Sequence, residues 1–206
     1  MIVPGPIIHS AVAEGRIRIT PYDQQQINPA SYDMRLGRQV TLYCADKQDA
    51  DDQMLLQRRG IISVPPACML DSKAENSTVS FDMQDSGFWL SPGTLYLMHT
   101  EESVFTERYV PVIDGKSSIG RLGIQVHMTA GFGDPGFNGQ FTLEVTVTGN
   151  TVKVYPGMRF CQVRFHEMQR SDCQLLYSGQ YQGQDARGAR PSRSWAQFER
   201  EPDRWK

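Results

Sequence analysis

The chain has 206 residues, with 21 lysine and arginine residues against 23 aspartate and glutamate residues. This near balance lacks the basic excess that coating a nucleic acid polymer requires. The chain also has no run of about 18 apolar residues that could span a bilayer. We therefore expect a cytoplasmic protein whose partners include neither a nucleic acid polymer nor a membrane, and the length predicts a single domain over residues 1–206.

The first half of the chain contains one predicted helix and one predicted excursion. A short amphipathic stretch at 7–15 ends in a glycine, which favours a helix that stops there. The stretch 45–59 is polar and rich in acidic residues, and it lies between strand-like segments. We interpret it as an exposed excursion from one domain.

The apolar pattern predicts an all-β protein with few short helices. Twelve prolines and eighteen glycines divide the sequence into short apolar stretches, several of which alternate with a period of two. A second short helix is predicted at 116–122, after an Asp-Gly turn. The clearest strand segments are 94–98, 140–147 and 151–155.

The segment 177–206 differs in composition from the rest of the chain. It is rich in glycine and glutamine at its start and carries Trp195 and Trp205 further on. Such a stretch does not suit a strand in a core, and it is either a disordered tail or a segment that orders over a ligand. The two tryptophans favour partial docking, and we interpret the segment as closing over the site.

The four cysteines give little support to a disulfide framework or a structural zinc site, because no two of them form a Cys-x-x-Cys pair. We expect most of them to be buried free thiols. They are Cys44, Cys68, Cys161 and Cys173.

The region between residues 114 and 144 carries most of the polar chemistry. Its first part reads Asp114-Gly-Lys-Ser-Ser-Ile-Gly-Arg-Leu-Gly123. A glycine turn, two hydroxyls and two cations within a few residues are the groups that bind phosphate oxygens. This segment is not a Walker A loop, because the spacing Gly-x-x-x-x-Gly-Lys-Ser is absent.

Further motifs accompany this segment in order along the chain. Downstream follow His127-Met-Thr-Ala-Gly131, Asp134-Pro-Gly-Phe-Asn-Gly139 and Phe141-Thr-Leu-Glu144, and upstream lies Asn28-Pro-Ala-Ser-Tyr-Asp-Met-Arg-Leu-Gly37. Together they resemble the dCTP deaminase branch of the dUTPase-like superfamily. The stretches Ser-Ile-Gly-Arg and Thr-Ala-Gly-Phe, with Gln162, are more similar to its bifunctional, dUMP-forming members.

This resemblance implies a distorted jelly-roll or β-barrel subunit that forms a homotrimer, with nucleotide sites between subunits. It also implies Mg²⁺ bound through the nucleotide triphosphate and no zinc. The zinc-dependent nucleobase deaminases need His-x-Glu and Pro-Cys-x-x-Cys. Here Cys68 has no second cysteine at that spacing, and His166-Glu167 has the wrong one.

The resemblance also implies which residues are catalytic. Glu144 matches the glutamate that moves protons during hydrolytic deamination, at an inward-facing strand position. Ser117 and Arg121 match the positions that hold the water and orient the glutamate, and the Ala130 carbonyl helps to place that water. Asp134 matches an aspartate that contacts the deoxyribose 3′-hydroxyl and activates the water attacking the α-phosphate.

Nucleotide contacts are implied at a longer set of positions. Two of the matches are imperfect, because Gln180 stands where some relatives have a phosphate-contacting lysine and Gly133 replaces the usual isoleucine. The implied contact residues are Lys116, Ser117, Ser118, Ile119, Gly120, Arg121, Asp134, Thr142, Leu143, Glu144, Gln162, Tyr177, Gln180 and Gln184.

Two further features of the matched motifs are interpreted as parts of the scaffold. His127 lies in an alternating, strand-like run and is expected to be structural. Asp33 and Arg35 are expected to form an ion pair in the core or between subunits.

The function that follows is zinc-independent hydrolytic deamination of dCTP to dUTP with release of ammonia, coupled to hydrolysis to dUMP and pyrophosphate. This product would supply thymidylate synthesis. Three alternatives stay open: a deaminase that stops at dUTP, a dUTPase alone, and a non-catalytic nucleotide-binding trimer.

Overall fold

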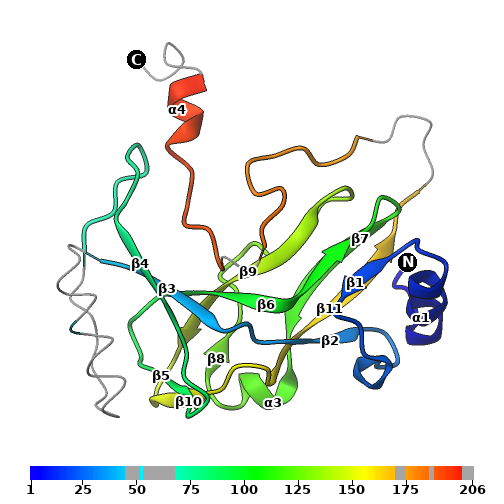
Figure 1. Cartoon of the computed structure of the whole chain (residues 1–206), viewed down its shortest axis with the longest axis horizontal. Helices are drawn as coiled ribbons and strands as arrows, with labels where there is room; N and C mark the ends of the chain where they lie inside the picture. The colour runs from blue at the N-terminus through cyan, green and yellow to red at the C-terminus, as the bar shows by residue number, and fades with distance from the viewer. Residues whose placement is uncertain (45–51, 53–67, 170–174, 186–187, 201–206) are drawn as a thin grey trace.

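Strands predominate in the computed structural model, which describes residues 1–44, 52, 68–169, 175–185 and 188–200 (Figure 1). The helices are short. In chain order the elements are α1 (Gly5–Ala13), β1 (Arg18–Thr20), the 3-10 turn η1 (Gln24–Gln26), β2 (Tyr32–Arg35), β3 (Gln39–Tyr43), β4 (Thr78–Asp82), β5 (Phe88–Leu90), β6 (Tyr96–Phe105), β7 (Tyr109–Gly115), α3 (Ser117–Gly120), β8 (Ile124–Gln125), β9 (Asn138–Val147), β10 (Val152–Val154), β11 (Arg159–Glu167) and α4 (Ala196–Arg200).

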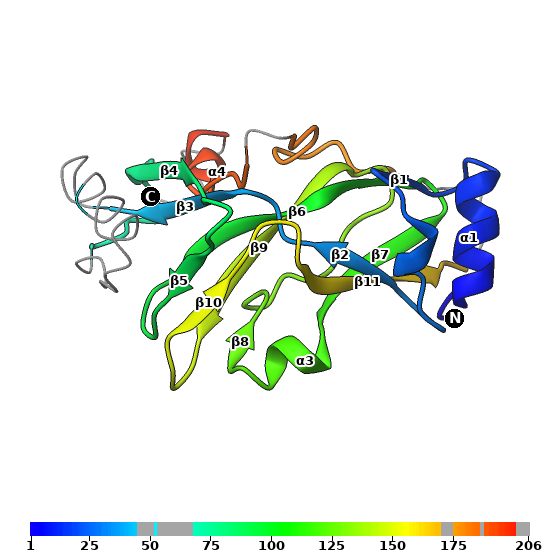
Figure 2. The same ribbon diagram turned by 60° about the horizontal axis from the view of Figure 1, so that its bottom comes forward.

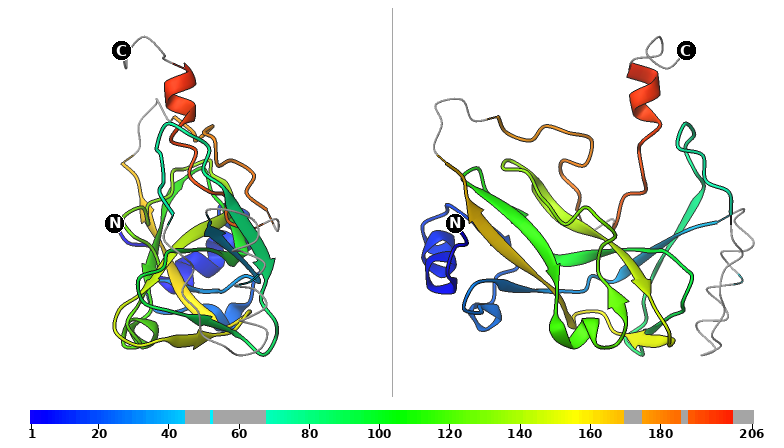
Figure 3. Two further views of the ribbon diagram at one scale, coloured as in Figure 1. Left: turned by 90° about the vertical axis from the view of Figure 1, so that its left-hand side faces the viewer. Right: turned by 180° about the vertical axis from the view of Figure 1, so that it is seen from behind.

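The strands form three antiparallel sheets around one interior. The largest has the order β4-β3-β6-β9-β8, with β1 also paired to β6. A second sheet has the order β2-β11-β7, and β10 pairs with β5. Figures 2 and 3 show the sheets wrapping around each other, with α1 outside β11 at one end of the molecule.

Alternation along β9 creates both the core and the face that carries the site. Leu143, Val145 and Val147 are buried and belong to the main apolar cluster. Because successive side chains on a strand point to opposite faces, Thr142 and Glu144 project away from that cluster. The predicted inward-facing position of Glu144 is therefore wrong with respect to the core, because its apolar neighbours Leu143 and Val145 occupy the inward face. The core packing of β9 therefore fixes the direction of the Glu144 side chain.

The predicted helices and strands correspond to observed elements with shifted ends. Helix α1 runs from Gly5 to Ala13, and Gly15 follows it with a φ of 73°. The second predicted helix is confined to the single turn of α3. The strand predicted at 94–98 begins at Tyr96 and extends to Phe105, so it is much longer than the alternation indicated.

Some expectations fall on parts of the chain outside the description. The excursion predicted at 45–59 lies outside the described residues except for Asp52, and so does Cys173. Cys161 is a buried free thiol as expected, and burial raises its pKa, whereas Cys44 and Cys68 are only half-buried. No helix in the described ranges combines the length and apolar character needed to cross a membrane.

Buried charges join β2 to its neighbours. Asp33 accepts from Lys116 Nζ at 2.5 Å and lies 3.8 Å from Arg159, and its side chain is 3% exposed. Arg35 pairs with Glu102 at 2.7 Å, and that carboxylate is fully buried. The expected ion pair between Asp33 and Arg35 is therefore wrong, because each of the two side chains has its own partners.

Candidate active site

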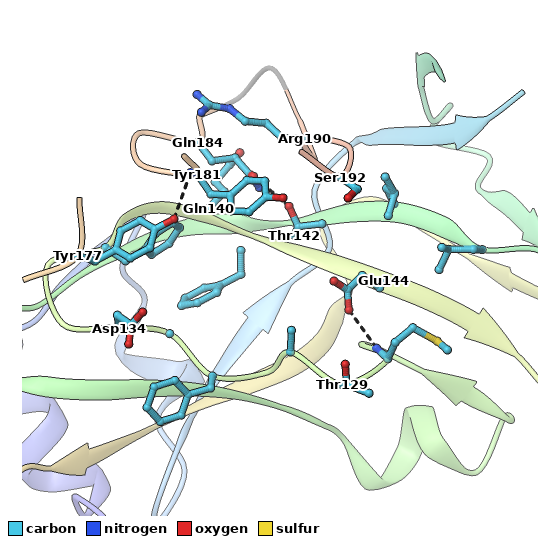
Figure 4. A pocket seen from close by; sticks show the side chains of 18 of the residues that line it. Thr129, Asp134, Gln140, Thr142, Glu144, Tyr177, Tyr181, Gln184, Arg190 and Ser192 are labelled. Carbon is cyan, nitrogen blue, oxygen red and sulfur yellow. Dashed lines mark hydrogen bonds between the residues drawn. The ribbon is translucent and has the colours of Figure 1, made fainter. Parts of the chain in front are cut away.

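A cavity of about 580 Å³ opens beside β9. Its walls come from β9, from the loop that follows β8 and from the C-terminal tail. Figure 4 shows Tyr181, Gln184 and Ser192 along one side and Thr129 and Asp134 along the other, with Thr142 and Glu144 between them. The full lining consists of Tyr43, Leu95, Leu97, Met128, Thr129, Ala130, Phe132, Gly133, Asp134, Phe137, Gln140, Phe141, Thr142, Glu144, Tyr177, Tyr181, Gln184, Arg190 and Ser192.

Glu144 is half-buried and points into this cavity. Its Oε2 accepts a hydrogen bond from the backbone N–H of Met128 at 3.1 Å. Met128 precedes Thr129 and Ala130, which also line the cavity. The carboxylate is thus held beside the loop whose Ala130 carbonyl the sequence associates with the catalytic water.

The outer edge of β9 is interrupted at the same place. Gln140 N–H donates to the carbonyl of Gln184, and Thr146 pairs with Gln125 of β8. Residues on one strand edge alternate, so the backbone groups of Thr142 face outward in the gap between these two partners. A flat ligand with hydrogen-bond donors and acceptors along its edge could bind to the backbone groups of Thr142 in this gap.

Asp134 stands at the start of a tight turn. Its carbonyl accepts from Phe137 N–H at 3.1 Å, and Gly136 within the turn has a φ of 90°. The side chain is exposed to the cavity mouth. The turn therefore presents a carboxylate to any ligand that enters from that side.

An aromatic wall lies next to Asp134. The rings of Phe137 and Phe141 are 5.1 Å apart, and Phe137 contacts Tyr177 edge-on at 5.9 Å. A Cβ at Gly133 would lie only 2.9 Å from the Phe141 ring. Phe141 thus fills the space that the usual isoleucine side chain at position 133 would need.

The tail is held against β9 by its own backbone and side chains. Gly183 N–H donates to the Asn138 carbonyl at 2.9 Å, and Gln184 Oε1 accepts from the Thr142 hydroxyl at 2.9 Å. Gln184 is 2% exposed, and its Nε2 has no described hydrogen-bond partner. Its amide N–H₂ group is therefore a buried donor available at the cavity wall.

The structure brings only some of the predicted residues together. Those in the cavity are Ala130, Asp134, Thr142, Glu144, Tyr177 and Gln184. Leu143 points into the core, and Gln180 is half-buried in the tail outside the lining. The residues that lie away from the cavity are Lys116, Ser117, Ser118, Ile119, Gly120, Arg121 and Gln162.

This second group surrounds α3. Ser117, Ser118 and Arg121 are exposed, whereas Ile119 is buried in the core and anchors the turn. Gln162 holds the residue before the turn in place, because its Nε2 donates to the Gly115 carbonyl while its Oε1 accepts from the Ser31 hydroxyl. The α3 group is thus a preformed surface feature of the subunit.

His127 behaves as a packing residue in the region that joins the two groups. Its ring is half-buried against Gly131, where a Cβ would lie 2.7 Å from Nε2. It does not line the cavity.

Several lining residues have no signal in the sequence. Tyr43 belongs to β3 and accepts a hydrogen bond from Ser192 N–H of the tail at 2.9 Å. Tyr181 N–H donates to the Tyr177 hydroxyl at 3.1 Å. Only the folding of the tail back over the sheet brings Tyr43 and Ser192 together at the cavity, so local patterns do not reveal these two positions.

The fold and the cavity define an all-β protein with a small-molecule site that offers carboxylates for proton transfer, an apolar wall and backbone groups for recognition. A sequence model of the family described as "dCTP deaminase-like" matches residues 2–168. The chain belongs to this family.

Individual relatives agree with the family. The chain is 36% identical over 200 residues to a Clostridium beijerinckii protein named "dCTP deaminase, dUMP-forming", covering 97% of this chain and 100% of the relative. It is 38% identical over 184 residues to a Leptospira biflexa protein of the same name, covering 89% of this chain and 91% of the relative.

A solved structure shares the fold. The 2′-deoxycytidine 5′-triphosphate deaminase from Agrobacterium tumefaciens matches with a TM-score of 0.57 and 23% identity over 81% of this chain. The match covers 48% of that longer chain, so this protein spans about half of its length. The predicted all-β, dUTPase-like fold class is confirmed.

Proposed function

We propose that this protein deaminates dCTP to dUTP with release of ammonia and then hydrolyses dUTP to dUMP and pyrophosphate. The observation that carries the proposal is the position of Glu144, a half-buried carboxylate held toward the 128–130 loop inside a nucleotide-sized cavity. The names of the relatives, "dCTP deaminase, dUMP-forming", support the coupled reaction.

The first step adds water to C4 of the cytosine ring. Glu144 accepts a proton from the water, whose oxygen bonds to C4, and delivers a proton to ring N3. The proton of the new C4 hydroxyl then passes through Glu144 to the amino group, so that the C4=O bond forms as the C4–N bond breaks and ammonia leaves. We assign recognition of the base to the outward backbone groups of Thr142 and to the amide of Gln184.

The second step is assigned to Asp134. Its carboxylate would accept a proton from a second water, whose oxygen bonds to the α-phosphorus. The bond to the bridging oxygen breaks, and pyrophosphate leaves. The aromatic wall beside Asp134 suits the apolar face of a deoxyribose, whose 3′-hydroxyl we place at this carboxylate.

We infer that each complete site forms between two subunits of a homotrimer. The cavity lining includes two carboxylates, Asp134 and Glu144, but one cation, Arg190. A triphosphate carries several negative charges, so further cations must approach it. The exposed α3 group of a neighbouring subunit supplies Arg121 and Ser117, which also hold the water at Glu144, and the hydroxyl of Ser118. Lys116 can join them only by leaving its ion pair with Asp33.

Mg²⁺ is proposed to arrive with the triphosphate, whose oxygens are the hard ligands that this ion prefers. In the described part of the chain, no group of three or more His, Cys, Asp or Glu side chains is arranged to hold a metal. The ion would neutralise phosphate charge during the hydrolytic step.

We further propose that residues 177–206 form part of the same domain and close over the nucleotide. The tail carries Tyr177, Tyr181 and Gln184 to the cavity wall, which supports this proposal.

The test is to incubate the purified protein with dCTP and Mg²⁺, with and without a zinc chelator, and to separate dUTP, dUMP and pyrophosphate by chromatography. Direct appearance of dUMP and pyrophosphate, unaffected by the chelator, is the expected result. Accumulation of dUTP would identify a deaminase that stops there. No conversion of dCTP would overturn the proposal and would leave hydrolysis of added dUTP, or binding without turnover, as the remaining functions.

A further inference from the structure

Arg190 is the basic side chain among the cavity-lining residues that the structure describes. It comes from the tail, on the same side as Tyr181 and Gln184 and across the pocket from Asp134 (Figure 4). None of the sequence motifs described above includes it.

The hydrogen bonds of Arg190 hold the guanidinium without neutralising it. Nη1 donates to the carbonyls of Gln180 and Gln182 at 3.3 and 3.4 Å, and Nη2 donates to the Gly183 carbonyl at 3.3 Å. These acceptors are uncharged. In the described ranges, the ion pairs of Arg16, Arg35, Arg38, Arg159 and Arg164 all involve carboxylates, and Arg190 forms none.

A guanidinium has five N–H donors, so three carbonyl contacts leave two donors for a ligand. Its planar, permanently charged group suits phosphate oxygens. The three carbonyls also fix the group in one place, which lowers the entropy lost when a ligand binds. Arg190 thus combines free charge, free donors and a fixed position in a cavity that otherwise carries two carboxylates.

We propose that Arg190 binds the polyphosphate of the nucleotide and supplies the positive charge of the tail, an inference that rests on the proposed function. Its location also explains how the tail can bind a phosphate although position 180 is glutamine rather than lysine. The Gln180 carbonyl is itself one of the acceptors of Arg190, so the cation lies next to the position where some relatives have a lysine.

The test compares binding of dCTP and dCMP, in the presence of Mg²⁺, by isothermal titration calorimetry. Arg190→Gln should raise the Kd for dCTP by about tenfold or more, because a charge-assisted contact is lost. The Kd for dCMP should change much less, since dCMP lacks the distal phosphates. Thermal unfolding of the variant checks that it is folded.

Arg193→Gln is the matched control. Arg193 Nη1 also donates to the Gln180 carbonyl, at 3.4 Å, but Arg193 does not line the cavity. Its loss should leave the ratio of the two Kd values unchanged. The double variant Arg190→Gln/Gln180→Lys should recover most of the dCTP affinity, because it restores charge without restoring the three carbonyl contacts.

Equal weakening of dCTP and dCMP binding by Arg190→Gln, without rescue by the lysine, would overturn the proposal and leave Arg190 as a structural tie within the tail. So would an unchanged dCTP affinity. Failure of the proposed function is a separate result, because turnover of dCTP by the wild-type protein tests that function independently of the Kd ratio.

Discussion

The backbone N–H of Met128 donates to the Glu144 carboxylate across 3.1 Å, and this bond joins β9 to the loop that follows β8. It fixes one carboxylate oxygen and leaves the other directed at the cavity. A proton carrier needs this kind of restraint, because its transfer distances must be short and reproducible.

Removing the negative charge of this group should stop deamination. Glu144→Gln should lower the rate of ammonia release from dCTP by roughly 10² to 10⁴-fold, since the proton carrier is lost. Coupled detection of ammonia measures this. A variant that still deaminates dCTP at the wild-type rate would exclude Glu144 from the chemistry.

Mixing two inactive variants tests the shared site. Glu144→Gln disables the cavity of its own subunit, and Arg121→Gln disables the exposed α3 group. After unfolding and refolding together in equal amounts, random trimers should regain about a quarter of the wild-type activity, because each mixed trimer contains one intact combination. The control is the same two variants mixed in their folded, assembled state, so that their subunits do not exchange. No recovery after verified exchange would place both residues in the same subunit's site.

The two reaction steps should separate at Asp134. Asp134→Asn should leave deamination active and make dUTP accumulate from dCTP, because the water attacking the α-phosphorus loses its base while the asparagine oxygen can still accept from the 3′-hydroxyl. Chromatography of the products over time measures this. Continued formation of dUMP at the wild-type rate would assign the hydrolytic step to another group.

Docking of the tail should depend on Gly139. A Cβ there would lie 2.6 Å from the Gln184 carbonyl oxygen and 2.9 Å from its nitrogen, both backbone atoms. Gly139→Ala should therefore displace the tail, raise KM by about tenfold or more and speed proteolysis of the tail. Asn138→Ala is the matched control, since that side chain is exposed and its backbone contacts stay intact. Unchanged KM in Gly139→Ala would show that closure does not need this contact.

Stability should fall below pH 6.5 because of His99. Burial lowers the pKa of His99 from its ordinary value of 6.5. Its Nε2 accepts from Gln39 N–H at 3.2 Å, which requires the neutral ring. As the pH drops through 6.5, the unfolded chain binds a proton that the folded chain does not yet bind, so the free energy of unfolding decreases.

The free energy of unfolding in urea is measured from pH 7 to about pH 5, above the pH at which ordinary carboxylates titrate. The contribution of His99 is the difference in pH dependence between the wild type and a variant without this histidine. His99→Gln should be less stable than the wild type at pH 7 and less sensitive to pH over this interval. Equal pH dependence in both proteins would contradict the assignment.

The sequence indicates candidate catalytic residues within single segments, but it does not indicate which distant residues meet at the cavity. Glu144 lies in an alternating run, and alternation alone places it opposite Leu143 and Val145. The α3 motif is likewise local. Tyr43 and Arg190 line the cavity only because the tail folds back over the sheet. The Phe141 ring fills the space beside Gly133 because the loop packs against β9. Such contacts join distant residues, and no periodic pattern encodes them.

The two ends of the chain differ in a way that matters for handling the protein. Met1 is exposed and bonds through its backbone to Glu167 at the end of β11, whereas Arg190 and Ser192 of the tail line the cavity and Ser192 bonds to Tyr43. An affinity tag at the C-terminus would therefore extend from the segment that we propose closes over the nucleotide, while a tag at the N-terminus would extend from the sheet that contains β11. Kinetic work on this protein should use the N-terminal position.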